Sequence, residues 1–190
     1  MNGFGLLLLS LVLVTPVEAA EATGGGAWTI GPNFGFSVVS ASGGGGSIVA
    51  LGWPSGGGLF LGGVQPGLRV GYVTPAGGSD IYLDTGVNYA SSAGSSVYSV
   101  MNTVNFQVNF ARRSDITPYV TAGAGFALTG FSDYSETHAL FGLGVGMRRM
   151  VSDGHGAVRS EFRFDRLGGS NRESGLNSFA VKIGVDLWIR

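Results

Sequence analysis

The segment from Ala157 to Leu167 contains a regular pattern of charged residues, and their spacing would bring the charged groups together. Arg159, Glu161, Arg163 and Asp165 alternate in sign at every second position. Because alternate residues of a β-strand point to the same side, these four side chains would share one face. Two interpretations follow: a mutually neutralising network that fills a narrow barrel, or a charged constriction in a conducting pore.

Further charged residues stand in segments where polar and apolar residues alternate, and they occupy the polar positions. They join the expected lumen network: Arg69, Asp84, Arg148, Lys182 and Asp186. An arginine on the lipid side at the middle of a bilayer would cost about 2–4 kcal/mol, which favours an inward position for the set. A turn centred on residues 76–77 would place Arg69 directly opposite Asp84. We therefore expect these two side chains to form an ion pair inside the barrel.

The remaining candidate groups lack the spacing that catalysis, metal binding or cofactor binding requires. The chain has two histidines, His138 and His155, and no cysteine, so a zinc site would need borrowed carboxylates. The glycine runs at 43–46 and 56–58 lack the lysine and the following serine or threonine of a phosphate-binding loop. The sequence therefore predicts no catalytic residue, no metal and no cofactor.

The segment Val97–Ala111 shows which kind of element must position these groups. One parity is apolar, with Tyr98, Val100, Val104, Phe106, Val108 and Phe110, and the other is polar, with Ser99, Thr103, Asn105, Gln107 and Asn109. The alternation predicts a β-strand. Its polar face carries no charge, whereas strands that face water usually carry lysine, glutamate and arginine. Small neutral polar residues suit a narrow lumen and the apolar face suits lipid, so we expect a membrane-spanning strand.

The same alternation recurs along the chain and predicts an all-β fold, a closed antiparallel transmembrane β-barrel of eight strands. The strands are expected at Trp28–Ser40, Gly67–Val73, Ile81–Tyr89, Val97–Ala111, Pro118–Gly130, His138–Met150, Ala157–Leu167 and Ser178–Ile189. Pro32 predicts a local irregularity in the first strand. Residues 47–63 are ambiguous, and a separate hairpin there would raise the number of strands to ten.

Composition agrees with a single membrane-barrel domain. Charged residues make up 12% of the 190 residues, against about 25% in ordinary soluble domains. The net charge of −1 and the lack of a basic patch mixed with aromatic residues argue against nucleic-acid binding.

Residues 1–22 have the features of a secretory signal. Leu6–Val14 is a short apolar run, and small residues follow it at a cleavage pattern that ends at Ala19 or, as the second choice, at Ala22. We therefore predict a signal peptide at residues 1–19 and a barrel domain at residues 20–190.

The runs WTIGPNFGFS, PGLRVGYVTP, DIYLDTGV and TPYVTAGAGFAL, together with the alternating C-terminal strand, resemble the small eight-stranded outer-membrane β-barrels of bacteria, the OmpA/OmpX-like proteins. The resemblance covers residues 27–190. It implies a monomer exported to the outer membrane of a Gram-negative-type bacterium, surrounded by outer-membrane lipid and assembled by the barrel-assembly machinery.

These expectations favour a non-catalytic envelope protein with an occluded polar lumen, contributing to envelope integrity or surface interactions. A narrow channel for small solutes is the second interpretation. The third is a lipid A-modifying enzyme, since some barrels of this kind act through histidine, serine and an acid near one rim, and the fourth is a soluble ligand-binding barrel. His138 and His155 are expected at opposite rims, and neither has a His-x-Ser arrangement with a nearby carboxylate.

Overall fold

A computed structural model gives the fold and describes residues 26–41, 47–52, 67–75, 78–92, 95–110, 116–131, 134–151, 155–168 and 175–189. The predicted signal peptide lies outside these residues and stays a prediction. Within the described ranges, no helix has the length and apolar character needed to cross a membrane.

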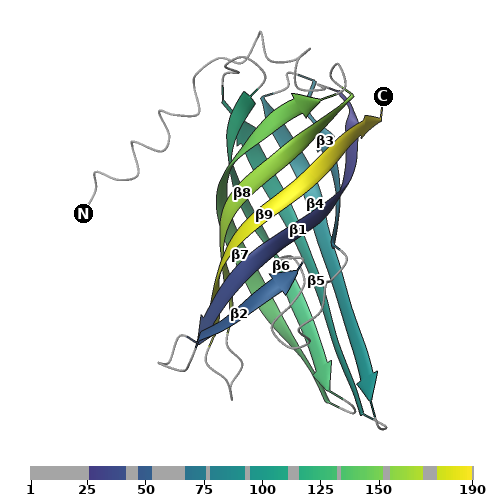
Figure 1. The fold of residues 1–190 in the computed structure, drawn as a ribbon, viewed down its shortest axis with the longest axis vertical. Helices are drawn as coiled ribbons and strands as arrows, with labels where there is room; N and C mark the ends of the chain where they lie inside the picture. The colour runs from purple at the N-terminus through teal and green to yellow at the C-terminus, as the bar shows by residue number, and fades with distance from the viewer. Residues whose placement is uncertain are drawn as a thin grey trace, which may run out of the picture.

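The described residues form β-strands joined in one antiparallel sheet that closes on itself (Figure 1). The strands are β1 (Trp28–Ala41), β2 (Ser47–Gly52), β3 (Gly67–Val73), β4 (Ser79–Ser92), β5 (Ser95–Asn109), β6 (Ile116–Phe131), β7 (Tyr134–Val151), β8 (Gly156–Leu167) and β9 (Leu176–Ile189). Closure comes from β1 and β9, which pair from Trp28 opposite Ile189 to Ala41 opposite Leu176. The first and last described strands therefore begin and end side by side, at what we call the termini end of the barrel; the opposite end is the far end.

Two of the nine segments share one position in the barrel wall. β9 pairs along one edge of β1, so β2 and β3 must both use the other edge. There β3 pairs with residues 28–33 and β2 with residues 35–40, both antiparallel to β1. The barrel is therefore the predicted eight-stranded one, and residues 47–52 form the far part of its second strand. Residues 53–63 lie outside the described ranges.

The expected irregularity at Pro32 is present in the first strand. Gly31 and Pro32 pair with β3 but interrupt the pairing of β1 with β9, which resumes at Asn33. A Cβ atom on Gly31 would collide with the backbone carbonyl of Val185, so only glycine fits this close approach.

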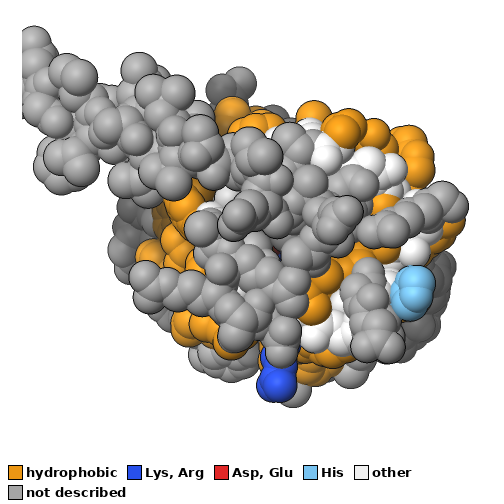
Figure 2. Space-filling view, turned by 90° about the horizontal axis from the view of Figure 1, so that it is seen from above, with side chains coloured by type: hydrophobic (Ala, Val, Ile, Leu, Met, Phe, Trp, Pro, Cys, Tyr) orange, Lys and Arg blue, Asp and Glu red, His pale blue; other side chains and the backbone are white. Residues whose placement is uncertain are grey.

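Side chains alternate strictly between an apolar outer wall and the lumen. On β5, Val104 and Phe106 expose 59% and 49% of their surface, whereas Asn105 between them exposes 1%. Large apolar side chains also point outward on each of the remaining strands whose side chains are described. Figure 2, which looks onto the termini end, shows hydrophobic side chains around the periphery of the molecule.

The wall is not of equal height all round. The β4–β5 and β6–β7 hairpins extend past the rest of the barrel at the far end (Figure 1). Strand pairing in these hairpins continues to Ser92 opposite Ser95 and to Phe131 opposite Tyr134.

Candidate functional site

The structure places all nine charged residues expected in the lumen on the inner face of the barrel, and each exposes 5% of its surface or less. Alternation positions them, since each shares parity with the inward residues of its strand. They come from five strands: Arg69 on β3, Asp84 on β4, Arg148 on β7, Arg159, Glu161, Arg163 and Asp165 on β8, and Lys182 and Asp186 on β9.

The expected ion pair between Arg69 and Asp84 is present at the centre of this set. The two residues are direct cross-strand partners, and the guanidinium donates two parallel hydrogen bonds, Nε to Oδ1 at 2.8 Å and Nη2 to Oδ2 at 3.0 Å. Asn33 Nδ2 donates to the same carboxylate at 3.1 Å, and Lys182 Nζ lies 3.6 Å from it. Arg69 also lies over the ring of Tyr82, with 3.5 Å between Cζ and the ring centroid. Asp84 is therefore held by partners from β1, β3 and β9.

The row on β8 connects to this pair. Arg163 Nε donates to Asp165 Oδ1 at 2.7 Å, and its Nη1 lies 3.5 Å from Glu161 Oε1. Glu161 in turn lies 3.6 Å from Arg69 Nη2 and accepts a hydrogen bond from the Tyr119 hydroxyl at 3.1 Å. The charges that alternate along one strand thus join an ion pair formed between two others.

A tenth charged residue, Asp80 on β4, belongs to the network and was missed by the sequence interpretation. Its Oδ2 lies 2.5 Å from Arg148 Nη2, and Arg148 Nε lies 3.3 Å from Asp186 Oδ2. Asp186 also pairs with Arg159 at 3.3 Å, and Arg159 donates to Asn33. The signal was available, because Asp80 shares the parity of Asp84.

The completed set, which we call the lumen charge network, holds five acids and five bases. The acids are Asp80, Asp84, Glu161, Asp165 and Asp186, and the bases are Arg69, Arg148, Arg159, Arg163 and Lys182. Balance matters because an unpaired charge removed from water is costly, whereas a paired and hydrogen-bonded one is tolerated.

Glycines on β7 provide the room for the long side chains of β8. Gly142 lies opposite Asp165 and Gly144 lies opposite Arg163. A Cβ atom on Gly142 would collide with the Asp165 carboxylate and the Arg163 guanidinium, and one on Gly144 would lie 2.7 Å from Thr121 Cγ2. The alternating glycines of β7 therefore serve packing inside the barrel.

Apolar layers flank the lumen charge network on both sides, which the expectation of a uniformly polar lumen did not include. The termini-end apolar layer consists of Ala27, Val73, Ala157 and Trp188, with Met150 packed against it. The far-side apolar layer consists of Met101, Ala127, Leu140 and Leu167, with Leu176 packed against it. The lumen charge network is therefore bounded by an apolar layer on each side.

The histidines lie at opposite ends of the barrel, and one detail differs from expectation. At the far end, His138 Nδ1 lies 3.1 Å from the Gly168 carbonyl oxygen, and its Nε2 lies 3.5 Å from Glu136 Oε2, so a carboxylate is close after all. The sequence interpretation missed Glu136, two residues away on the same strand face. His155 lies at the termini end, where its carbonyl accepts a hydrogen bond from the backbone N–H of Trp188.

Among the described residues, no group of three or more histidine, aspartate or glutamate side chains is arranged to hold a metal ion. The carboxylates of the lumen charge network contact arginine, lysine and amide groups.

No protein-family model matches this chain, and no curated protein matches it. Solved structures do match. The crystal structure of Neisserial surface protein A (NspA) has 17% sequence identity and a TM-score of 0.65, covering 86% of this chain and 99% of NspA. Ail, the attachment invasion locus protein of Yersinia pestis, has 11% identity and a TM-score of 0.54, covering 87% and 99%. The outer membrane protein AlkL, determined in DMPC bilayers, has 16% identity and a TM-score of 0.50, covering 87% and 91%.

At these identities the likeness establishes the fold. The chain is a closed eight-stranded antiparallel β-barrel of the kind found in small outer-membrane proteins, as the resemblance to the OmpA/OmpX-like proteins implies.

Proposed function

We propose that this chain is an integral outer-membrane protein that spans the bilayer as an occluded barrel and acts without catalysis, contributing to envelope integrity or surface interactions. One observation carries the proposal: ten charged side chains are buried in the lumen, while large apolar side chains cover the outer wall. In water this arrangement would bury charge and expose apolar surface. In a bilayer the outer wall meets hydrocarbon, and closure of the sheet pairs the first described strand with the last.

The height of the apolar wall supports a membrane position. Two arginines point outward on the β7–β8 face, Arg149 near the termini end and Arg166 near the far end. Arg166 is the cross-strand partner of Phe141, and Phe141 lies eight residues from Arg149 along β7. Eight residues span about 27 Å along a strand. With the usual tilt this is about 20 Å along the barrel axis, close to the apolar band of about 25 Å in such barrels.

The packed lumen supports an occluded barrel over a channel. The network residues expose 5% of their surface or less, and apolar layers flank them on both sides. Eight strands leave an interior that side chains can fill. We propose that the protein is a monomer in outer-membrane lipid, exported by the predicted signal peptide and assembled by the barrel-assembly machinery.

Envelope fractionation followed by electrophoresis with and without boiling tests the membrane barrel. We expect the protein in the outer-membrane fraction, with different mobilities before and after boiling. Recovery in the aqueous phase with a single mobility would contradict it. Planar-bilayer recordings test occlusion separately, since a stable, large conductance from the purified protein would rule out a filled lumen.

A further inference from the structure

The outer wall carries a cationic polar group directly beside an apolar hollow. Among described outward-facing side chains, only Arg149 and Arg166 are charged. Arg166 Nη1 donates a hydrogen bond to Asn177 Oδ1 at 2.7 Å, and this contact is exposed. This contact uses the amide oxygen of Asn177. Among the described residues, the Nδ2 donor of Asn177 and the other N–H donors of Arg166 therefore remain for a ligand.

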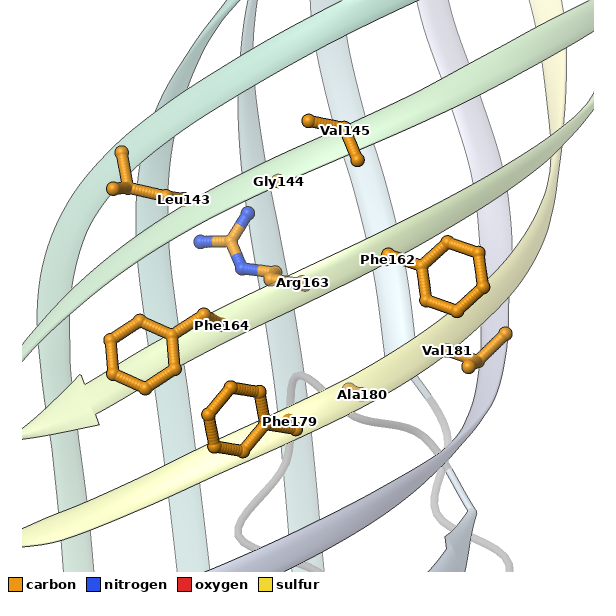
Figure 3. A pocket seen from close by; sticks show the side chains of 9 residues that line it. All are labelled: Leu143, Gly144, Val145, Phe162, Arg163, Phe164, Phe179, Ala180 and Val181. Carbon is orange, nitrogen blue, oxygen red and sulfur yellow. The ribbon is translucent and has the colours of Figure 1, made fainter.

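The hollow lies on the same face, across β7, β8 and β9. Figure 3 shows apolar side chains around it, with Leu143, Phe162, Phe164, Phe179 and Val181 at its walls. Its volume is about 460 Å³, and the rings of Phe164 and Phe179 lie 5.0 Å apart between centroids. Gly144 and Ala180, whose strand positions face inward, also line it.

The strand register places the polar group at one end of the hollow. Phe164 is the cross-strand partner of Phe179, and Arg166 is the partner of Asn177, two residues further toward the far end. Two residues along a strand correspond to about 7 Å. The guanidinium and amide donors thus lie just beyond the aromatic wall, on the same surface of the barrel.

The chemistry of the two parts selects one occupant. No acidic side chain points outward among the described residues, so the polar end favours an anion. A guanidinium matches the paired oxygens of a phosphate, and aromatic and aliphatic walls match a hydrocarbon chain. We propose that this groove binds a phosphate-bearing membrane lipid, with its phosphate on Arg166 and Asn177 and an acyl chain between Phe162, Phe164 and Phe179. This inference rests on the proposed membrane location.

Native mass spectrometry of the purified full-length protein in detergent tests the site. The probes are phosphatidylglycerol and a diacylglycerol with the same acyl chains, which lacks the phosphate. We expect the phosphatidylglycerol adduct to be retained about tenfold more, the scale of one charge-assisted hydrogen bond. Arg166→Gln and Asn177→Ala should each reduce that retention, whereas Arg149→Gln, the outward arginine outside the hollow, should leave it unchanged. Phe179→Ala should weaken retention of both lipids.

Several results would overturn the site. Equal retention of the two lipids by the unchanged protein would remove phosphate recognition. Equal losses of phosphatidylglycerol retention with Arg166→Gln and Arg149→Gln would show that any outward arginine attracts the lipid. A dimer that Phe179→Ala dissociates would identify a second copy of the chain as the occupant. Displacement of the adduct by inorganic phosphate alone would remove the acyl-chain contact. The boiling shift of each variant reports the barrel itself, so loss of the lipid site and failure of the membrane proposal remain distinguishable.

Discussion

The lumen charge network and the far-side apolar layer fill the same narrow space in different ways. In the network, long charged side chains of β8 lie opposite glycines of β7, and every charge has an oppositely charged neighbour, in most cases on another strand. In the apolar layer, Leu140 and Leu167 are direct cross-strand partners and need only volume. Removal of one charged side chain from the network should therefore leave its partners unpaired, whereas removal of methyl groups from the apolar layer should leave only a cavity.

The largest effect is expected from Asp84→Ala. It leaves Arg69, Lys182 and Asn33 without their shared carboxylate and should lower the free energy of unfolding by about 4 kcal/mol. The double change with Arg69→Ala should cost less, because it removes the principal uncompensated charge. Urea unfolding in lipid vesicles measures both. Thr85→Ala, the next residue on β4 and outside the lumen, is the control, and strictly additive losses from the two single changes would contradict the pairing.

Leu140→Ala tests the apolar layer. Leu140 exposes 1% of its surface, so its truncation should leave a cavity and lower the free energy of unfolding by about 3 kcal/mol. Leu143→Ala is the matched control three residues along the same strand, on the outer wall, where it exposes 62%. Lipid can fill the space left there, so its unfolding should change little. A larger loss from Leu143→Ala would reverse the assignment of the two faces.

Much of this arrangement was predictable from parity alone. Alternation assigned Val104, Asn105 and Phe106 to their correct sides, and turn geometry set the register of Arg69 with Asp84. Both results depend on contacts that are local in the sequence. A slip by one residue would have exchanged the two faces of a strand, so the pattern specifies the register strongly.

Contacts across the lumen were not predictable in this way. Parity says on which side a residue lies, but it does not say how far along the barrel its partner sits. Asp80 on β4 meets Arg148 on β7, two strands that do not pair, and this contact depends on how the closed sheet staggers. The far-side apolar layer was missed for a related reason: Met101 is an apolar residue among mostly polar ones of the same parity on β5, and only its neighbours in space reveal a layer.

Gly142→Ala should have a smaller effect, within the charged region. The added methyl group would press on the Arg163–Asp165 contact, so the free energy of unfolding should fall by about 2 kcal/mol through overpacking. The control is Gly168→Ala, where a Cβ atom would find its nearest neighbour, the Ala139 carbonyl oxygen, at an ordinary 3.6 Å. Equal stability of the two variants in urea unfolding would mean that the charged region packs as loosely as the rim.

The smallest effect is expected at Tyr82, whose side chain serves the network in two ways. Its hydroxyl lies 2.7 Å from Thr121 Oγ1, and its ring lies under the guanidinium of Arg69. Tyr82→Phe removes only the hydrogen bond and should lower the free energy of unfolding by about 1 kcal/mol. Tyr82→Leu also removes the ring face, so it should cost about 1 kcal/mol more. In the Arg69→Ala, Asp84→Ala background that additional loss should disappear, because no cation remains above the ring. If it persists there, the ring contributes volume to the lumen, as Leu140 does, and the contact with Arg69 adds nothing to stability.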